Sequence, residues 1–174
     1  MSLRNALLVL GLMASLGASA ATFTLSAKPG EFNPKSLGNP SPRGVLSASL
    51  QITKFVPSKG WPPAAYVGFF QGKNRDNSVQ FLVIRNRETD PYVVAGHRIV
   101  EGGKEVKVAS LANLPLDGKA QVTISIDNGL VTLNFPPQAP VTFRTKLTEV
   151  SPYVSVSSGT AEFSVGPSQE TPLK

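Results

Sequence analysis

Residues 120–135 read AQVTISIDNGLVTLNF, and this stretch decides the fold class. Its first eight residues alternate strictly between apolar and polar side chains, a period of two that sends one row into a core and the other into water. The dipeptide Asn128-Gly129 follows, and it favours a tight turn because both residue types tolerate a positive φ. The remaining residues return as a second alternating run. The stretch therefore predicts an antiparallel β-hairpin.

The same alternation recurs along the rest of the chain. Predicted inward rows are Leu46, Ala48, Leu50 and Ile52; Val106 and Val108; and Val141, Phe143 and Leu147. Runs that are apolar on both faces, typical of central strands that are covered on both sides or flank a groove, are residues 65–70, 79–85 and 93–100. Short strands are expected at residues 23–27, 153–156 and 161–165. Roughly ten or eleven strands with no helical period favour an all-β, antiparallel two-sheet β-sandwich.

Stretches rich in Pro, Gly and Asn punctuate these strands. Residues 29–42 and 57–63 read as loops, and Asp117-Gly118 reads as a turn. Fifteen Gly and fifteen Pro in 174 residues also argue against a helical bundle.

The amino-terminal segment has the pattern of a secretory signal peptide. Arg4 precedes a short apolar run, and Ala18-Ser19-Ala20 forms a small-residue cleavage motif. The predicted organisation is a signal peptide at residues 1–20, cut after Ala20, a β-sandwich domain at residues 21–166 and a flexible tail at residues 167–174. We expect a secreted or periplasmic product with no membrane span after processing.

Composition excludes several kinds of chemistry. The chain has no Cys, which excludes disulfides, thiolate metal sites and cysteine nucleophiles, and it has a single His. Its 17 Lys and Arg against 11 Asp and Glu give a net charge of +6, which becomes +5 when residues 1–20 and their one Arg are removed. The basic residues are dispersed, so we expect no nucleic-acid partner, while attraction to an anionic glycan stays open.

The order of these elements resembles the concanavalin A-like lectin/glucanase superfamily, including its laminin G-like members, over about residues 45–165. The matching stretches are residues 65–70, 77–83, 116–118 leading into 122–126, 127–131 and 153–163. What the resemblance implies is an antiparallel jelly-roll sandwich with one concave sheet, often used to bind glycans. The resemblance assigns no catalytic residue to this chain, because the matching stretches are motifs of the fold and not of a site.

Carboxylate patterns give little support for glycoside hydrolysis. The Glu-x-Asp-x-x-Glu strand of retaining glucanases in this superfamily is absent. The nearest approaches are Glu88-Thr89-Asp90, which Pro91 turns into a loop, and Glu101 with Glu105, which read as a hairpin tip.

A polysaccharide lyase would need a base such as His or Tyr beside a group that neutralises an acid. His97, Arg98 and Tyr92 are the one constellation of that kind. Neighbouring residues of a strand point to opposite faces, so His97 and Arg98 cannot share a groove, and a partly buried, hydrogen-bonded His97 is expected instead. Residues 74–77 supply oxygens but too few carboxylates for calcium, and they read as a polar turn. We expect no metal and no cofactor.

Aromatic rings and planar polar groups are the side chains that recognise sugars. The candidates for ligand contact are Trp61, Tyr66, Gln80, Arg85, Tyr92 and Arg98. The sequence thus predicts an exported, non-catalytic, lectin-like module that binds a glycan or polysaccharide. Two alternatives stay open: a domain that binds another exported protein, favoured by an exposed apolar row near Leu82 and Ile84, and a lyase or hydrolase.

Overall fold

The computed structural model of the chain describes residues 20–72 and 76–166. The predicted tail lies outside these ranges, as does the predicted signal peptide apart from Ala20. Ten β-strands and no helix occur in the described ranges, so no helix there could cross a membrane. The strands are β1 (Ala21–Ser36), β2 (Arg43–Phe55), β3 (Ala64–Gln71), β4 (Asn77–Ile84), β5 (Tyr92–Glu101), β6 (Lys104–Pro115), β7 (Ala120–Asp127), β8 (Leu130–Asn134), β9 (Val141–Arg144) and β10 (Ser151–Val165).

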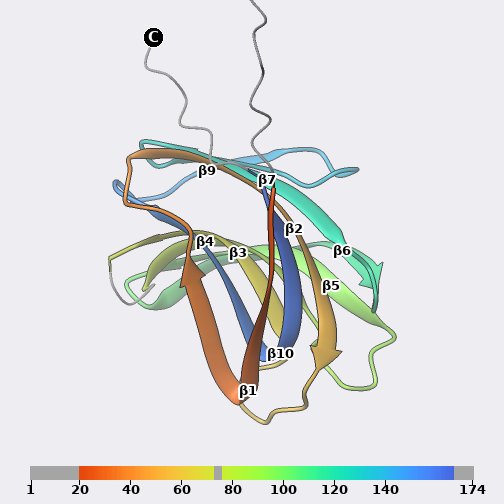
Figure 1. The fold of residues 1–174 in the computed structure, drawn as a ribbon. Helices are drawn as coiled ribbons and strands as arrows, with labels where there is room; N and C mark the ends of the chain where they lie inside the picture. The colour runs from red at the N-terminus through yellow and green to blue at the C-terminus, as the bar shows by residue number, and fades with distance from the viewer. Residues whose placement is uncertain (1–19, 73–75, 167–174) are drawn as a thin grey trace, which may run out of the picture.

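All strand pairs are antiparallel, in the order β6-β5-β4-β3-β10-β2-β7-β8-β9, with β1 along β10. The first part of β10, residues 151–157, pairs with β3, and its last part, residues 159–165, pairs with β2. The sheet is therefore folded into two layers. Layer A contains β6, β5, β4 and β3, layer B contains β2, β7, β8 and β9, and both β1 and β10 run through the bend that joins them (Figure 1).

Ser158 is the residue at which β10 changes layers. It has φ +45°, a left-handed conformation that non-glycine residues rarely adopt. Opposite it, β1 has a register shift between Ala27 and Phe32, with Gly30 at φ +76°. The Gly30 amide donates a hydrogen bond of 2.9 Å to Ser158 Oγ, so the two bends are fastened to each other.

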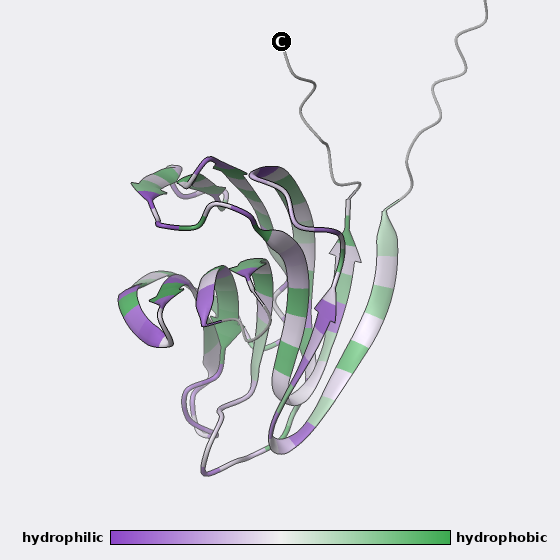
Figure 2. Ribbon diagram, turned by 90° about the vertical axis from the view of Figure 1, so that its left-hand side faces the viewer, coloured by the Kyte–Doolittle hydropathy of each residue, from purple (hydrophilic) through white to green (hydrophobic). Residues whose placement is uncertain are grey.

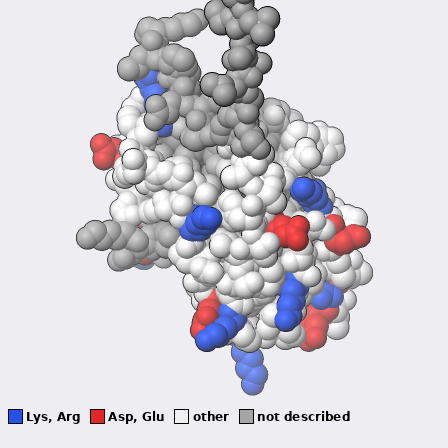
Figure 3. Space-filling model, viewed as in Figure 1, with Lys and Arg blue, Asp and Glu red and all other residues white. Residues whose placement is uncertain are grey.

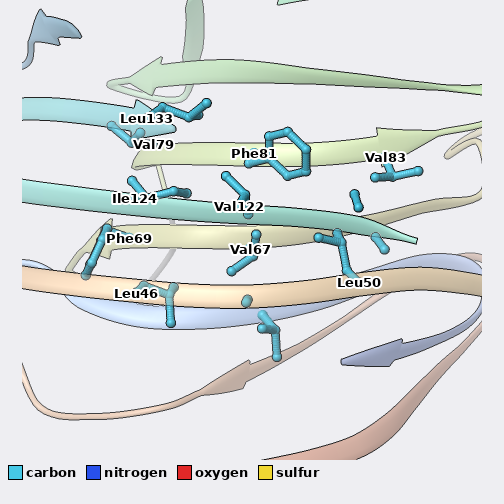
Figure 4. Packing of buried hydrophobic residues seen from close by; sticks show 14 of the residues in the cluster. Leu46, Leu50, Val67, Phe69, Val79, Phe81, Val83, Val122, Ile124 and Leu133 are labelled. Carbon is cyan, nitrogen blue, oxygen red and sulfur yellow. The ribbon is translucent and has the colours of Figure 1, made fainter. Parts of the chain in front are cut away.

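The core lies between the layers. Side chains of β3 and β4 face those of β2, β7 and β8, and the labelled members shown in Figure 4 are all buried. Hydrophobic and hydrophilic residues alternate along many strands, as Figure 2 shows, which is the period-two pattern expected of strands with one face in a core. The predicted hairpin is confirmed as β7 and β8 with Asn128 and Gly129 at positive φ.

Two predicted boundaries are wrong. The predicted loop at residues 29–42 begins inside β1, because residues 32–36 continue the pairing with β10. The strands predicted at residues 153–156 and 161–165 are parts of the single strand β10, which pairs with β1 on both sides of the bend, with a register shift opposite Ser158.

The predicted inward direction of Val106 and Val108 is also wrong. Their side chains are 55% and 57% exposed, because β6 is an edge strand of layer A with register shifts where it pairs with β5. Leu147 is buried as expected, but it lies beyond the end of β9.

Candidate functional site

The outer face of layer A carries the candidate site. Tyr66, Gln80 and Arg98 alternate with the core residues of β3, β4 and β5, so they point away from layer B. Gln80 and Arg98 are directly paired across β4 and β5. The strand periodicity alone therefore brings three of the predicted ligand residues to one face.

A hydrogen-bonded pair of planar groups forms the polar floor of this face. Arg98 donates from Nε and Nη2 to Gln80 Oε1 at 2.9 and 2.6 Å, and Gln80 Nε2 donates to Ser78 Oγ at 2.8 Å. Glu105 Oε2 lies 3.7 Å from Arg98 Nη1. These bonds hold the amide and the guanidinium in one geometry, although Gln80 is only 3% exposed.

Aromatic rings border the polar floor. The Phe32 ring lies between Trp61 and Tyr66, with centroids 6.1 and 5.5 Å away, and the Arg98 guanidinium carbon lies 5.4 Å from the Tyr66 centroid. Tyr66 is buried, whereas Trp61 is 45% exposed. Trp61 is thus the aromatic residue of this cluster that offers most of its side chain to a ligand.

Two consecutive serines of β10 fix the loop that carries Trp61. Ser157 Oγ donates to the carbonyl of Pro62 at 2.7 Å, and Ser158 Oγ donates to the carbonyl of Trp61 at 2.6 Å. The Tyr66 hydroxyl lies 3.4 Å from Ser157 Oγ. The loop is therefore attached to the bend of the sheet at two successive carbonyls.

These groups enclose a pocket of about 370 Å³, which we call the outer-face pocket. Its charged groups are one cation, Arg98, and two carboxylates, Asp76 and Glu105. The residues that line it are Phe32, Trp61, Asp76, Gln80, Arg98, Val100, Gly103 and Glu105. Basic and acidic side chains are interspersed over the face of the molecule shown in Figure 3, so no broad field of one sign covers that face.

The structure brings together four of the six predicted ligand residues. Trp61, Gln80 and Arg98 line the outer-face pocket, and Tyr66 lies directly beneath Arg98. Arg85 instead lies against Phe55, with its guanidinium carbon 4.9 Å from the ring centroid, in a different pocket. Tyr92 is 37% exposed at the start of β5, and it lines neither pocket.

His97 points into the core, opposite to Arg98. Its ring is 2% exposed and stacks on Phe143 with centroids 5.5 Å apart. Burial, and to a smaller extent the charge of Lys107, lower the pKa of His97. The expected burial is seen, but the expected hydrogen bond is not, because neither ring nitrogen has a partner among the described residues. His97 therefore does not share a groove with Arg98.

The remaining sequence candidates have other surroundings. Residues 74 and 75 of the predicted polar turn lie outside the described ranges, while Asp76 and Asn77 bond the hairpin tip after β5 through the amides of Gly103 and Gly102. Leu82 and Ile84 are half-buried, so they form no exposed apolar row. In the described part of the chain no three His, Asp or Glu side chains cluster as metal ligands.

Several residues of the site escaped the sequence reasoning. Phe32 stood in a presumed loop, and Ser157 and Ser158 read as ordinary small strand residues. A usable sign was the run Ser157-Ser158-Gly159, which breaks the alternation of β10 at the bend. Asp76 and Glu105 come together only through the pairing of distant strands.

Comparisons with known proteins identify the fold. No protein-family profile and no characterised protein matches the sequence. Among solved structures, a functionally unknown protein from Saccharomyces cerevisiae is similar, with a TM-score of 0.58 and 10% identity over 88% of this chain and 89% of that one. The carbohydrate-binding module CBM66 from Bacillus subtilis gives a TM-score of 0.54 and 13% identity, with coverages of 83% and 92%.

A third similar structure is an enzyme, the alginate lyase A1-II′ of polysaccharide lyase family 7. Its TM-score is 0.51 at 11% identity, with coverages of 86% of this chain and 78% of that one. The chain therefore has the antiparallel jelly-roll sandwich of concanavalin A-like proteins, as the sequence predicted. At these identities the likeness establishes the fold alone.

Proposed function

We propose that this protein is an exported carbohydrate-binding module that holds a sugar in the outer-face pocket without cleaving it. The observation that carries the proposal is the placement of the exposed Trp61 ring beside the fixed Gln80–Arg98 pair. An aromatic ring can pack against the C–H face of a sugar, while the Arg98 guanidinium can donate to its hydroxyls and the buried Gln80 holds that guanidinium in place.

Preorganisation supports binding at this pocket. The Trp61 loop is held by two hydrogen bonds from β10, and Arg98 is held by two hydrogen bonds to Gln80. Groups that are already fixed lose little conformational entropy when a ligand arrives, so more of their contact energy contributes to affinity. Export is part of the proposal because of the signal-peptide pattern at residues 1–20.

The similar structures support the class of ligand. One is a carbohydrate-binding module and another an alginate lyase, so this architecture serves both binding and cleavage of carbohydrates. Here the only imidazole, His97, lies on the opposite face of layer A from the pocket. This placement favours binding over a lyase reaction that uses histidine as its base.

A second candidate function is hydrolysis, favoured by the two carboxylates Asp76 and Glu105 in the pocket. It predicts release of reducing ends from a bound glycan, lost in Asp76→Asn and Glu105→Gln. The binding proposal predicts no release over hours from any polysaccharide that the protein binds.

Glycan-array screening of residues 21–174, followed by calorimetry on the best neutral oligosaccharide, tests the proposal. Trp61→Ala is expected to weaken binding at least tenfold, while Tyr92→Ala, which removes an exposed aromatic ring outside the pocket, leaves the affinity unchanged. Equal losses in both variants, or no neutral glycan bound at millimolar concentration, would reject the proposal.

A further inference from the structure

A second pocket lies on the other side of the loop that carries Trp61. It has a volume of about 470 Å³, and we call it the end pocket. Residues 57–63 form one side of it, and the segment after β4 forms the other, joined by a hydrogen bond of 3.0 Å from the Arg85 amide to the Pro63 carbonyl. The lining residues are Phe55, Pro57, Ser58, Lys59, Pro62, Pro63, Arg85, Asn86, Arg87 and Glu88.

Arg85 is the fixed polar group of the end pocket. Its guanidinium lies against the Phe55 ring, and its Nε and Nη2 donate to the Asp90 carbonyl at 3.1 and 3.0 Å. Arg85 lines the pocket and is only partly buried, and no described residue accepts a hydrogen bond from its Nη1. An arginine held in this way presents a planar donor group whose geometry matches a carboxylate.

The charge of the end pocket is positive. Lys59, Arg85 and Arg87 line it against a single carboxylate, Glu88. The Asp90 carboxylate, which accepts a hydrogen bond of 3.0 Å from the Arg87 amide, adds a negative charge nearby but does not line the pocket. Three cations against one acid contrast with the one cation and two carboxylates of the outer-face pocket. The end pocket is thus suited to an anion.

The other walls are apolar or neutral. Phe55, Pro57, Pro62 and Pro63 supply flat apolar surface, and Asn86 supplies an amide. Rings of proline and phenylalanine can pack against the C–H face of a sugar, and an amide can bond its hydroxyls. A small inorganic anion would use the cations and leave these walls uncovered.

We propose that the end pocket is a second binding site, which takes a carboxylate-bearing sugar of an acidic saccharide. The carboxylate binds Arg85 with support from Lys59 and Arg87, and the sugar ring packs on the proline and phenylalanine walls. This site goes beyond the proposed function of the outer-face pocket, and it does not require that pocket to be occupied.

Calorimetry with trigalacturonate and with its fully methyl-esterified form tests this inference at 25 mM NaCl. The two probes share a backbone, and only the acid carries charge. The acid is expected to bind at least tenfold more tightly than the ester. Arg85→Lys, which keeps the charge but loses the planar donors, is expected to weaken acid binding about tenfold, and Arg87→Gln about threefold. Lys104→Ala, an equal charge change on an exposed hairpin tip, is the matched control and should have no effect.

Several results would overturn the inference. They are equal affinities for acid and ester, no acid binding at millimolar concentration, or a loss in Lys104→Ala that equals the loss in Arg87→Gln, which would indicate attraction to net charge alone. Failure of this site can be told from failure of the outer-face pocket. Acid binding that is lost in Trp61→Ala and kept in Arg85→Lys places the acid in the outer-face pocket and rejects the end pocket. Acid binding that needs Arg85 but not Trp61 supports the end pocket, whatever the neutral glycans show.

Discussion

The two pockets on either side of residues 57–63 differ in how they are built. The outer-face pocket stands on paired strands, where Gln80 and Arg98 are neighbours in adjacent strands and Trp61 lines the same pocket. The end pocket stands on loops, where Pro62 and Pro63 form walls and Arg85 is held by a backbone carbonyl. One short loop therefore contributes an aromatic ring to one surface and proline rings to the other.

The two pockets also differ in charge, so one scaffold can present two surfaces that suit different ligands. On the outer face two carboxylates outnumber the single cation, so we expect contacts with the rings and hydroxyls of a sugar to determine affinity. In the end pocket the cations outnumber the acids, so we expect charge to contribute to affinity and salt to weaken binding. Both surfaces depend on the same anchor, the pair Ser157 and Ser158.

Removing the Trp61 indole should separate the two pockets most strongly, because it is expected to affect only one of them. In Trp61→Ala we expect neutral-glycan binding to weaken about thirtyfold, equivalent to about 2 kcal/mol, because buried tryptophan contacts dominate many binding sites. Binding of trigalacturonate should change less than threefold. Calorimetry with both probes measures this, and a parallel loss for the two would show that the pockets are not independent.

Removing the shared anchor should affect both pockets together. The double variant Ser157→Ala and Ser158→Ala loses two hydrogen bonds to the loop, each worth about 1 kcal/mol, and we expect about tenfold weaker binding of both probes. Ser49→Ala, in the middle of β2 in layer B, is the control. If the double variant weakens only one probe, the loop is not a common wall.

The sequence predictions differ in success between the two pockets for the same reason, because one pocket stands on paired strands and the other on loops. Gln80 and Arg98 were found because alternation along a strand fixes the face of each side chain, and pairing then brings them together. Arg85 was misplaced because it lies at the end of the predicted strand, where alternation stops and a loop carbonyl determines its direction. Tyr92 is the first residue of β5, so alternation does not determine the direction of its side chain either.

Other parts of the molecule were beyond local reasoning for a different reason. The bend of β10 at Ser158 depends on contacts with Gly30 and Trp61, which are far away in the chain. The exposure of Val106 and Val108 depends on β6 being an edge strand, which alternation within β6 cannot reveal. Sequence periodicity predicts faces well, and it does not predict edges, bends or loop walls.

Salt should sharpen the comparison. Raising NaCl from 25 to 150 mM shortens the screening length from about 20 to about 8 Å, which weakens attraction between exposed charges. We expect trigalacturonate binding to fall about threefold and neutral-glycan binding to change little. Titrations of the two probes at both salt concentrations check this, and equal salt dependence would contradict the assigned charge difference.

The smallest expected effect is that of pH on the stability of the fold, which limits the pH range in which ligand binding to the two pockets can be compared. Because the pKa of His97 is lowered in the folded protein, the unfolded chain takes up a proton first as pH falls below about 6.5. The contribution of neutral His97 to the free energy of unfolding is thus fully present above that pH and is lost below it. Urea unfolding at pH 7.5 and 5.5 should show a larger decrease for the wild type than for His97→Phe, which keeps a ring against Phe143. Equal decreases would exclude His97 as the cause.

The most direct test of sugar binding at the outer face is a nitrogen-15 NMR titration with the best neutral oligosaccharide. We predict that the Trp61 indole N–H and the backbone amides of Gln80 and Arg98 shift together and saturate at one dissociation constant, while the amides of Arg87 and Tyr92 stay in place. If the Trp61 indole and Arg98 do not respond while signals elsewhere saturate, the sugar binds at another surface and the proposed site is wrong.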